Sequence, residues 1–452
     1  MGCIDDDWFQ SSSFIDYLGS RKCSLSRKLR LLASLPTLSG TISRFEFQIF
    51  VSDSSVQLPN NELMFFREEI GESLTLKFAE SARKRRENKL PIISLGLGVP
   101  DFETPQSLVE ATIEQLRGGN SSYSSPLGLP SLRDQIAQRL STENGIPATS
   151  KNIIVAAGAK QAFQIVLMAL LQPEDEVVVV EPAFVSFIPQ IYLAEPACVV
   201  RTVDVNSKNF ELPFEALSAL VNEKTRAIVI NTPNNPAGYV WCESQLREIF
   251  ALAEKYDCYV ISDEVYEKLV YSDCSHFSIG SLESEVSRVI TINGYSKSHA
   301  MTGWRLGYAC YPNGLNAKIL KIQQHMNTNT CTFIQSAMAN VGASLDMEYL
   351  SSYCEKLKNR RDSVNEVINE TDGLSLVTPS SGFFAFIDIG QTGLDSNAFC
   401  GALLENTGVA TTPGIAFGKN WDDHIRLSYA TDEKTLNEGM SLLKHFSQEL
   451  MK

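Results

Sequence analysis

From about residue 150 the sequence alternates short runs of β-branched residues with longer amphipathic segments. The strand-like runs are NIIVAA, EVVVVE, RAIVIN, CYVISD and RVITIN, at 152–157, 176–181, 226–231, 258–263 and 288–293. Segments with helical spacing follow several of them, at Lys160–Leu171, Phe184–Leu193 and Glu243–Tyr256. This alternation is typical of a mainly parallel β-sheet covered by helices on both faces. The sequence therefore predicts an α/β fold, in which ligands bind at the carboxyl ends of the strands.

The two ends of the chain differ from this alternating region. After about residue 345 a long charged segment with helical spacing, Tyr349–Glu370, precedes the apolar run FFAFIDIG and further α/β segments. A chain of 452 residues is long enough for two domains that share a large buried core. We predict a large domain at 106–344, a small domain made of 61–105 and 345–452, and an N-terminal extension at 1–60.

The extension has a composition of its own. Residues 21–45 are rich in Ser, Arg and Leu and contain no acidic residue, which resembles a transit peptide to a plastid or mitochondrion. The acidic start at Asp5–Asp7 argues against one. A poorly ordered tail or a mispredicted first exon fits the composition as well. The cytoplasm is the default location, and an organelle address at 1–60 stays open.

Charge and cysteine usage narrow the classes of partner. The 53 acidic and 39 basic residues give a formal charge of −14, which repels phosphate backbones and acidic membrane surfaces. No apolar run approaches the roughly 18 residues that a membrane span needs. The ten cysteines include no C-x-x-C pair. We therefore expect no nucleic-acid partner, no membrane, no metal site and no disulfides, although a local basic pocket can still bind one small anion.

The segment NGYSKSHAMTGWRLG places Lys297 shortly after the run RVITIN, with Arg305 eight residues further on. A lysine that is buried or flanked by cations loses part of its preference for the charged form, as an amine that attacks an aldehyde requires. Arg305 has the planar donor fork that suits a phosphate. The alternatives are a solvated lysine at the start of a helix and an arginine in a surface ion pair.

The run CYVISD ends in Asp263, and Tyr266 follows three residues later, near enough to face the same pocket. A carboxylate in this place can keep a pyridine nitrogen protonated, so that the ring accepts electrons from a carbanion. A helix N-cap is the structural alternative for Asp263.

Two further motifs follow strand-like runs. After RAIVI, the segment NTPNNPAG predicts a rigid turn in which Asn235 presents an amide to a phenolic oxygen, unless the turn is purely structural. After NIIVAA, Ala159 and Lys160 open a helix behind Gly158, and free N–H groups there form an anion site. Helix starts with small residues are common, so the second motif is weak alone.

Together these motifs resemble the class I and II aminotransferases of fold type I, over roughly residues 90–445. The match includes SLGLGVPDF, NTPNNPAG, SDEVYE, MTGWRLGY, SSGFFAFID, PGIAFG and IRLSYA. The resemblance implies a seven-stranded, mainly parallel sheet with helices on both faces and a smaller α/β domain. It also implies the cofactor pyridoxal 5′-phosphate, an L-amino acid and a 2-oxo acid as substrates, and a homodimer.

Roles for the central residues come from the same resemblance. Lys297 would bind the cofactor as a Schiff base and move the proton of the substrate Cα. Asp263 would pair with the pyridine nitrogen, and Asn235 and Tyr266 would hydrogen-bond to the ring hydroxyl oxygen.

The resemblance assigns the remaining contacts to the cofactor phosphate, the ring face and the substrate carboxylate. Arg305 and the amides of Ala159 and Lys160 would hold the phosphate, and Phe184 would stack on the ring. Residues from two further segments complete the site. They are Tyr123, which would reach the phosphate of the neighbouring subunit, Arg426, which would bind the α-carboxylate as a bidentate pair, and Gly98, which would lie beside that carboxylate.

This sequence departs from the pattern at two positions, and the departures leave the substrate side chain open. Ala183 stands where many relatives carry an aromatic residue, and Ser298-His299 replaces a small–aromatic pair after the lysine. Transamination is the first hypothesis. A lyase or oxidase on the same scaffold is the second, and a non-catalytic ligand-binding regulator is the third. Intact Lys297 and Asp263, and no helix-turn-helix pattern at 1–60, argue against the regulator.

Overall fold

The computed structural model describes residues 70–342 and 347–452. The extension predicted at 1–60, with its targeting hypothesis, lies outside the described residues, as do residues 61–69 of the predicted small domain. In the part of the chain that the structure describes, no helix is long and apolar enough to cross a membrane.

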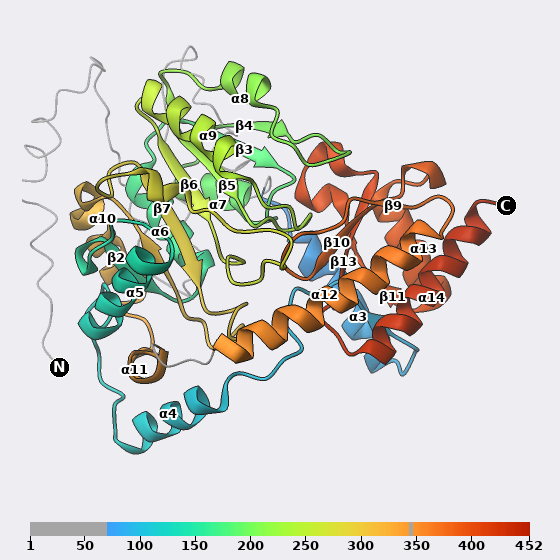
Figure 1. The fold of residues 1–452 in the computed structure, drawn as a ribbon, viewed down its shortest axis with the longest axis horizontal. Coiled ribbons are helices and arrows are strands. Elements are labelled where there is room, and N and C mark those ends of the chain that lie inside the picture. Colours follow the sequence, from blue (N-terminus) through green and yellow to red (C-terminus); the bar gives the residue numbers. More distant parts are fainter. Residues whose placement is uncertain (1–69, 343–346) are drawn as a thin grey trace, which may run out of the picture. The chain divides into compact units, whose positions relative to one another are not determined.

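A seven-stranded sheet forms the centre of the fold (Figure 1). Its strands, in order across the sheet, are β2 (Ile153–Ala156), β8 (Gly307–Cys310), β7 (Val289–Gly294), β6 (Tyr259–Asp263), β5 (Thr225–Asn231), β3 (Glu176–Glu181) and β4 (Val199–Asp204). β8 pairs antiparallel with both of its neighbours, and every other pairing is parallel. The prediction of a mainly parallel seven-stranded sheet is confirmed.

Alternate residues of the central strands face opposite helix layers, because successive side chains of a strand point to opposite faces. On β3, Val177 and Val179 pack in one core, and Val178 and Val180 pack in another. The first core includes residues of α6 (Ala159–Leu170), α7 (Phe187–Ala194) and α10 (Asn316–Met326). The second includes residues of α8 (Phe214–Leu220) and α9 (Glu243–Lys255). Both faces of the sheet are therefore buried, which explains the continuous apolar runs.

A third core covers the sheet at β2 and β8. It contains Ile153, Val155 and Tyr308 together with residues of α4 (Gln106–Arg117), α5 (Pro130–Glu143) and α11 (Thr332–Val341). Short 3-10 helices complete the connections, at η2 (Ser150–Asn152), η3 (Ile279–Leu282), η4 (Asn313–Leu315), η6 (Gly390–Thr392), η7 (Gly414–Phe417) and η8 (Lys419–Trp421).

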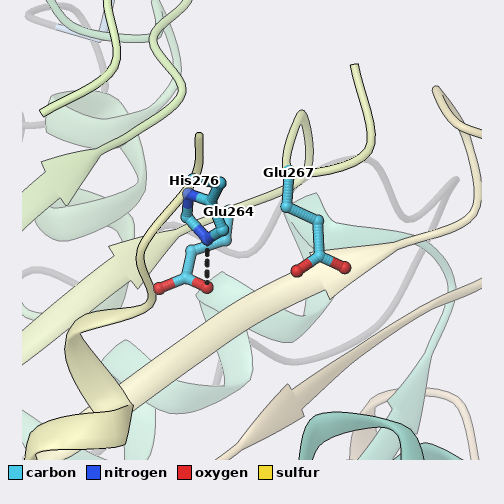
Figure 2. A group of neighbouring side chains, drawn as sticks. All are labelled: Glu264, Glu267 and His276. Carbon is cyan, nitrogen blue, oxygen red and sulfur yellow. Dashed lines mark hydrogen bonds and ion pairs between the residues drawn. The ribbon is translucent and has the colours of Figure 1, made fainter. Parts of the chain in front are cut away.

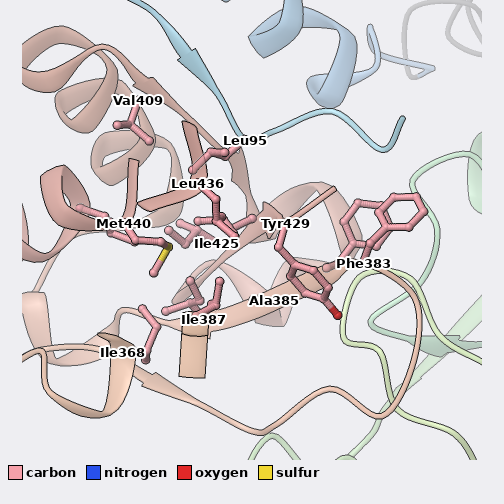
Figure 3. Packing of buried hydrophobic residues seen from close by; sticks show 14 of the residues in the cluster. Leu95, Ile368, Phe383, Ala385, Ile387, Val409, Ile425, Tyr429, Leu436 and Met440 are labelled. Carbon is pink, nitrogen blue, oxygen red and sulfur yellow. The ribbon is translucent and has the colours of Figure 1, made fainter. Parts of the chain in front are cut away.

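The C-terminal part of the chain forms a second, antiparallel sheet. Its strands, in order, are β12 (Thr412–Pro413), β13 (His424–Ser428), β10 (Phe384–Asp388) and β9 (Ser375–Leu376). Figure 3 shows buried side chains of this region, among which Ile387 and Ile425 lie near Leu436 and Met440. The helices of this region are α3 (Leu74–Glu87), α12 (Met347–Asn369), α13 (Ser396–Thr407) and α14 (Glu433–Leu450).

One strand pair joins distant parts of the sequence. β1 (Ile93–Ser94) pairs in parallel with β11 (Val409–Ala410), and Leu95 packs in the same core as Leu436 and Met440. The grouping of 61–105 with 345–452 and the domain boundaries at 105/106 and 344/345 stay predictions.

The strand-like runs correspond to β2, β3, β5, β6 and β7 within one or two residues, whereas one helix begins later than its pattern suggests. The segment Phe184–Leu193 predicts a helix from its first residue, but α7 begins at Phe187. Phe184 instead lies in the connection between β3 and α7.

Candidate active site

A cavity of about 300 Å³ opens at the carboxyl ends of the parallel strands and extends toward the antiparallel sheet. Ten of the eleven site residues expected from the sequence line it, and they are Gly98, Ala159, Lys160, Phe184, Asn235, Asp263, Tyr266, Lys297, Arg305 and Arg426. Asp263 is the one acidic residue among the lining residues, against four cations. The cavity therefore suits a ligand with more than one negative charge.

Lys297 follows β7 and extends into the cavity. Its Nζ donates to the backbone oxygen of Gly98 at 2.6 Å, and it lies 5.9 Å from the ring centre of Tyr266 and 5.6 Å from that of Phe383. Burial lowers the pKa of this amine from 10.5 to about 7, and the charges of Arg426 and Arg305 add to the effect. The surroundings of Lys297 therefore favour the neutral, nucleophilic form of the amine.

Asp263 is the last residue of β6 and is buried. Burial raises its pKa from 3.8 to about 7, and the neighbouring Glu264 carboxylate acts in the same direction. The backbone amide of Val265, at 3.2 Å from Oδ1, and the charge of Lys297 lower the pKa in opposition. A carboxylate held in this way has a strong preference for a cationic or hydrogen-donating partner in the cavity.

The turn after β5 presents Asn235. The Asn231 side chain fixes this turn, because its Oδ1 accepts from the Asn235 amide at 2.8 Å and its Nδ2 donates to the Asp263 carbonyl at 2.9 Å. Gly238 closes the turn with a φ of 71°, and a Cβ there would lie 2.9 Å from the Ser381 carbonyl oxygen. The Asn231 side chain therefore fixes the backbone of Asn235 relative to that of Asp263.

Tyr266 belongs to the turn after β6 and is buried. Its ring packs edge-on against Phe383 and Phe384, at centroid distances of 5.7 Å and 6.1 Å. Burial raises the pKa of the phenol, so the hydroxyl keeps its proton and acts as a hydrogen-bond donor. Within the described residues this hydroxyl has no hydrogen-bond partner, and it borders the cavity.

Arg426 lies on β13 and is only 4% exposed. It donates to Asn235 Oδ1 at 3.0 Å and to the Gly96 carbonyl at 2.7 Å, and its guanidinium lies 4.2 Å from the ring centre of Phe384. Its Nε is buried and has no partner among the described residues, and burial lowers the pKa of the guanidinium to about 10. A buried cation without an acidic partner is a strong candidate for binding a carboxylate.

The opposite end of the cavity contains the start of α6 and Arg305. Gly158 has a φ of 86°, and a Cβ there would lie 2.6 Å from an Arg305 nitrogen. The first amides of α6, on Ala159 and Lys160, have no hydrogen-bond partner within the described residues. Arg305 is exposed and donates to two backbone carbonyls, at 2.9 Å and 3.2 Å. Burial and the charge of Arg305 lower the pKa of Lys160.

Tyr123 is the one predicted site residue that this chain does not bring to the cavity. Its side chain is 87% exposed, between α4 and α5. Its role in the site of a neighbouring subunit stays a prediction.

Known proteins resemble this chain over nearly all of its described length. The family model of the class I and II aminotransferases matches residues 91–443. An aspartate aminotransferase of Pyrococcus abyssi is 41% identical over 361 residues, 79% of this chain and 92% of that protein. An aromatic-amino-acid aminotransferase of Thermococcus litoralis is 37% identical over 361 residues, with the same coverage of 79% and 92%. The chain belongs to the class I and II aminotransferases.

The solved structure of a relative has the same fold as this aminotransferase. The aspartate aminotransferase from Thermus thermophilus with maleate is 32% identical, with a TM-score of 0.80, over 84% of this chain and 98% of that chain. The protein is therefore an enzyme that transfers amino groups with pyridoxal 5′-phosphate. The comparisons do not favour a lyase, an oxidase or a non-catalytic regulator.

The cavity of the aminotransferase fits this cofactor. Lys160 and Arg305 lie at one end and Arg426 lies at the other, as a phosphate and a substrate carboxylate require. A buried acid for a ring nitrogen and a buried amine for an aldehyde lie between them. Phe184 borders the cavity and offers an aromatic face, and its ring lies 5.3 Å from Lys160 Nζ.

Sequence reasoning missed residues that line the cavity of the aminotransferase from elsewhere in the chain. Thr75 and Leu76 come from α3, and Phe384 comes from β10. Behind the lining residues, the Thr412 hydroxyl accepts from Arg426 at 3.4 Å. Phe384 belongs to the motif SSGFFAFID, which indicated the family but did not indicate that Phe384 lines the cavity. Nothing in the local sequence of α3 indicates that it reaches the cavity.

Proposed function

We propose that Lys297 binds the cofactor covalently and moves the proton of the substrate Cα during amino transfer between an L-amino acid and a 2-oxo acid. The observation that carries this proposal is the amine itself. It lies in a cavity beside one acid and three other cations, and its pKa is about 7. Such an amine attacks an aldehyde as a neutral base and afterwards accepts or returns a proton near neutral pH.

When bound, pyridoxal 5′-phosphate supplies an electron-withdrawing ring that delocalises the electron pair left on the substrate Cα. Asp263 would hold the proton of the ring nitrogen. Its carboxylate is suited to this role because it is buried and lies near the Val265 amide and the Lys297 amine. Asn235 and Tyr266 would donate to the ring hydroxyl oxygen. Gly98, whose carbonyl already accepts from Lys297, would lie beside the substrate carboxylate.

The anionic groups of cofactor and substrate would bind at opposite ends of the cavity. Arg305 and the free amides of Ala159 and Lys160 would hold the phosphate, because a helix start and an exposed guanidinium both favour a dianion. Arg426 would bind the substrate carboxylate with its planar donor fork. Phe184 would stack on the ring.

The absorption spectrum of the purified enzyme tests the proposal. Addition of cofactor should produce a visible band in the wild type, and Lys297→Ala should lose both the band and amino transfer. Ammonia release or oxygen consumption in place of transfer would favour the lyase or oxidase alternatives. A wild type that stays colourless with added cofactor would contradict the assignment of Lys297.

A homodimer with shared sites is part of this proposal, because Tyr123 is far more exposed than a residue of the same chain's site should be. Mixed dimers of Lys297→Ala and Tyr123→Phe subunits provide the test. The hybrid contains one site with both native residues, so activity should exceed that of either variant alone. Activity no higher than the sum of the two variants would contradict the shared site.

The walls of the cavity favour apolar or aromatic amino-acid side chains. Leu76, Leu97 and Val99 are large apolar residues that line the cavity and remain 67%, 44% and 47% exposed. Among the described lining residues, the four cations are already assigned to phosphate, aldehyde and α-carboxylate. We therefore expect phenylalanine or leucine to exceed aspartate as amino donor when kcat/KM is compared with 2-oxoglutarate, pyruvate and phenylpyruvate as acceptors. A higher kcat/KM for aspartate would contradict the preference.

The cytoplasm is the proposed location by default. The basic, Ser-rich composition of 21–45 is the reason to test an organelle instead. Fractionation of cells that express the full chain, or the chain without residues 1–60, distinguishes the two. An organelle signal that depends on 1–60 would overturn the default.

A further inference from the structure

A buried group of titratable residues lies directly behind Asp263. Successive side chains of an extended chain point to opposite faces, so Asp263 faces the cavity and Glu264 faces away from it. Figure 2 shows Glu264 beside His276, with Glu267 nearby. Glu264 Oε2 lies 3.1 Å from His276 Nε2, and both side chains are buried, at 0% and 9% exposed. Glu264, Glu267 and His276 do not line the cavity.

Protein partners already bind the carboxylate oxygens of this group. Glu264 Oε1 accepts from the hydroxyls of Ser262 and Ser278, at 2.9 Å and 3.0 Å. The oxygens of Glu267 accept from Arg139, at 2.6 Å, and from Asn144. A metal ion would have to displace these donors. We therefore interpret this group as carboxylates neutralised by neighbouring donors and cations, and not as a metal site.

The charge of Glu264 reaches both sides of the sheet. Burial lowers the pKa of His276, but the Glu264 carboxylate, with Glu267 as a further contributor, outweighs burial and raises that pKa above 6.5. The charge of Lys268 opposes this rise. Glu264 also raises the pKa of Asp263 on the cavity side. Whatever neutralises Glu264 therefore changes the electrostatic potential at Asp263.

We propose that His276 is a positioning residue for amino transfer, because its imidazolium neutralises Glu264 and so sets the potential that Asp263 and the cofactor ring experience from behind the sheet. This inference rests on the proposed role of Asp263. His276 touches neither substrate nor cofactor and acts through Glu264.

The sign of the effect follows from the charges. Without the imidazolium, Glu264 makes the potential at Asp263 and Lys297 more negative, so both groups retain their protons to higher pH. Replacing Glu264 by glutamine removes the negative charge, and burial then favours the neutral imidazole, so the net charge of the pair and the potential at Asp263 stay close to those of the wild type. Removing both charges should restore the native balance, which a purely structural role of His276 would not do.

The test is a pH titration of the visible absorption band of the full-length enzyme loaded with pyridoxal 5′-phosphate. His276→Gln should move the midpoint up by about 0.5 to 1 pH unit, whereas Glu264→Gln should leave it within about 0.2 units of the wild type. The double variant should return to within about 0.2 units of the wild type. His445→Gln is the matched control, because His445 pairs with Glu449 at 3.2 Å but is 69% exposed and should leave the midpoint unchanged.

The outcomes separate this inference from the proposed function. A wild type without a band would contradict the proposed function itself. A wild type with a normal band, and a His276→Gln midpoint equal to it, would overturn only the role of His276. If His276→Gln does not fold, His276→Asn takes its place, since an upward shift supports the proposal and an unchanged midpoint overturns it.

Discussion

The two ends of the cavity hold arginines in opposite environments. Arg305 is exposed and donates to two backbone carbonyls that water can replace. Arg426 is 4% exposed, lies 4.2 Å and 5.0 Å from the ring centres of Phe384 and Phe417, and donates to the side chain of Asn235. Arg305 is therefore a solvated contact for an anion, whereas Arg426 is a desolvated contact held in one position.

This difference indicates which residues contribute most to the free energy of substrate binding and of catalysis. A charge in water is screened and interacts weakly, whereas a buried charge interacts strongly and cannot be replaced by solvent. We therefore expect the buried half of the site, which holds Asp263, Lys297 and Arg426, to determine turnover and substrate binding. The exposed half, with Arg305 and Lys160, should contribute mainly to cofactor affinity.

Asp263→Asn should have the largest effect on turnover with the cofactor still bound. The amide cannot keep the ring nitrogen protonated, so kcat should fall on the order of 10³-fold, as when a preorganised electrostatic group is lost. Steady-state kinetics at saturating cofactor, with the absorption band as proof of loading, measures this. Full activity in a loaded variant would show that another group holds the proton.

Arg426→Ala should lower kcat/KM by about 30- to 1,000-fold for every amino acid, which corresponds to about 2 to 4 kcal/mol for a buried charge-assisted pair. The loss should appear mainly in KM and should change little between low and high salt. Arg426→Lys serves as the control that keeps the charge and loses the fork. An unchanged KM in the alanine variant would refute the carboxylate role.

Arg305→Ala should weaken cofactor binding by about tenfold, because the guanidinium is solvated and the α6 amides remain. The dissociation constant measured by band intensity should also be more sensitive to salt in the wild type than in the variant. If the variant binds cofactor as tightly as the wild type at low salt, the phosphate lies elsewhere.

Lys160→Ala should have the smallest effect, because the contribution of its charge is roughly that of an exposed ion pair. We expect the cofactor dissociation constant to rise about two- to threefold. Its backbone amide stays in place, and only the distant charge is lost. The same titration measures it, and a loss larger than that of Arg305→Ala would reverse the order that the comparison predicts.

Much of this site could be predicted because it depends on strand ends. Asp263, Asn235, Lys297 and the start of α6 each follow a run of β-branched residues, and parallel strands bring their carboxyl ends to one edge. The sequence motifs show which residue types are present, and the parallel sheet brings these residues to one edge.

Other features had a weaker local signal or none. β4 is an edge strand with mostly exposed or half-exposed side chains, and its sequence VVRTVD mixes β-branched residues with charged ones, so it lacks the continuous apolar run of the central strands. β8 is a four-residue strand of Gly-Tyr-Ala-Cys, which contains no β-branched residue. The Gly96 carbonyl that accepts from Arg426 is 330 residues away in sequence. The exposed segment that carries Leu76 reaches the cavity through the packing of α3, which its own sequence does not specify.

The account depends most on the protonation of a single amine. Competitive labelling of Lys297 in the cofactor-free enzyme across a range of pH measures it directly. Because burial and two guanidinium groups depress its pKa, labelling should rise as pH increases through about 7. A midpoint near the ordinary lysine value of 10.5 would show a solvated amine and would contradict the assignment of this cavity as the catalytic centre.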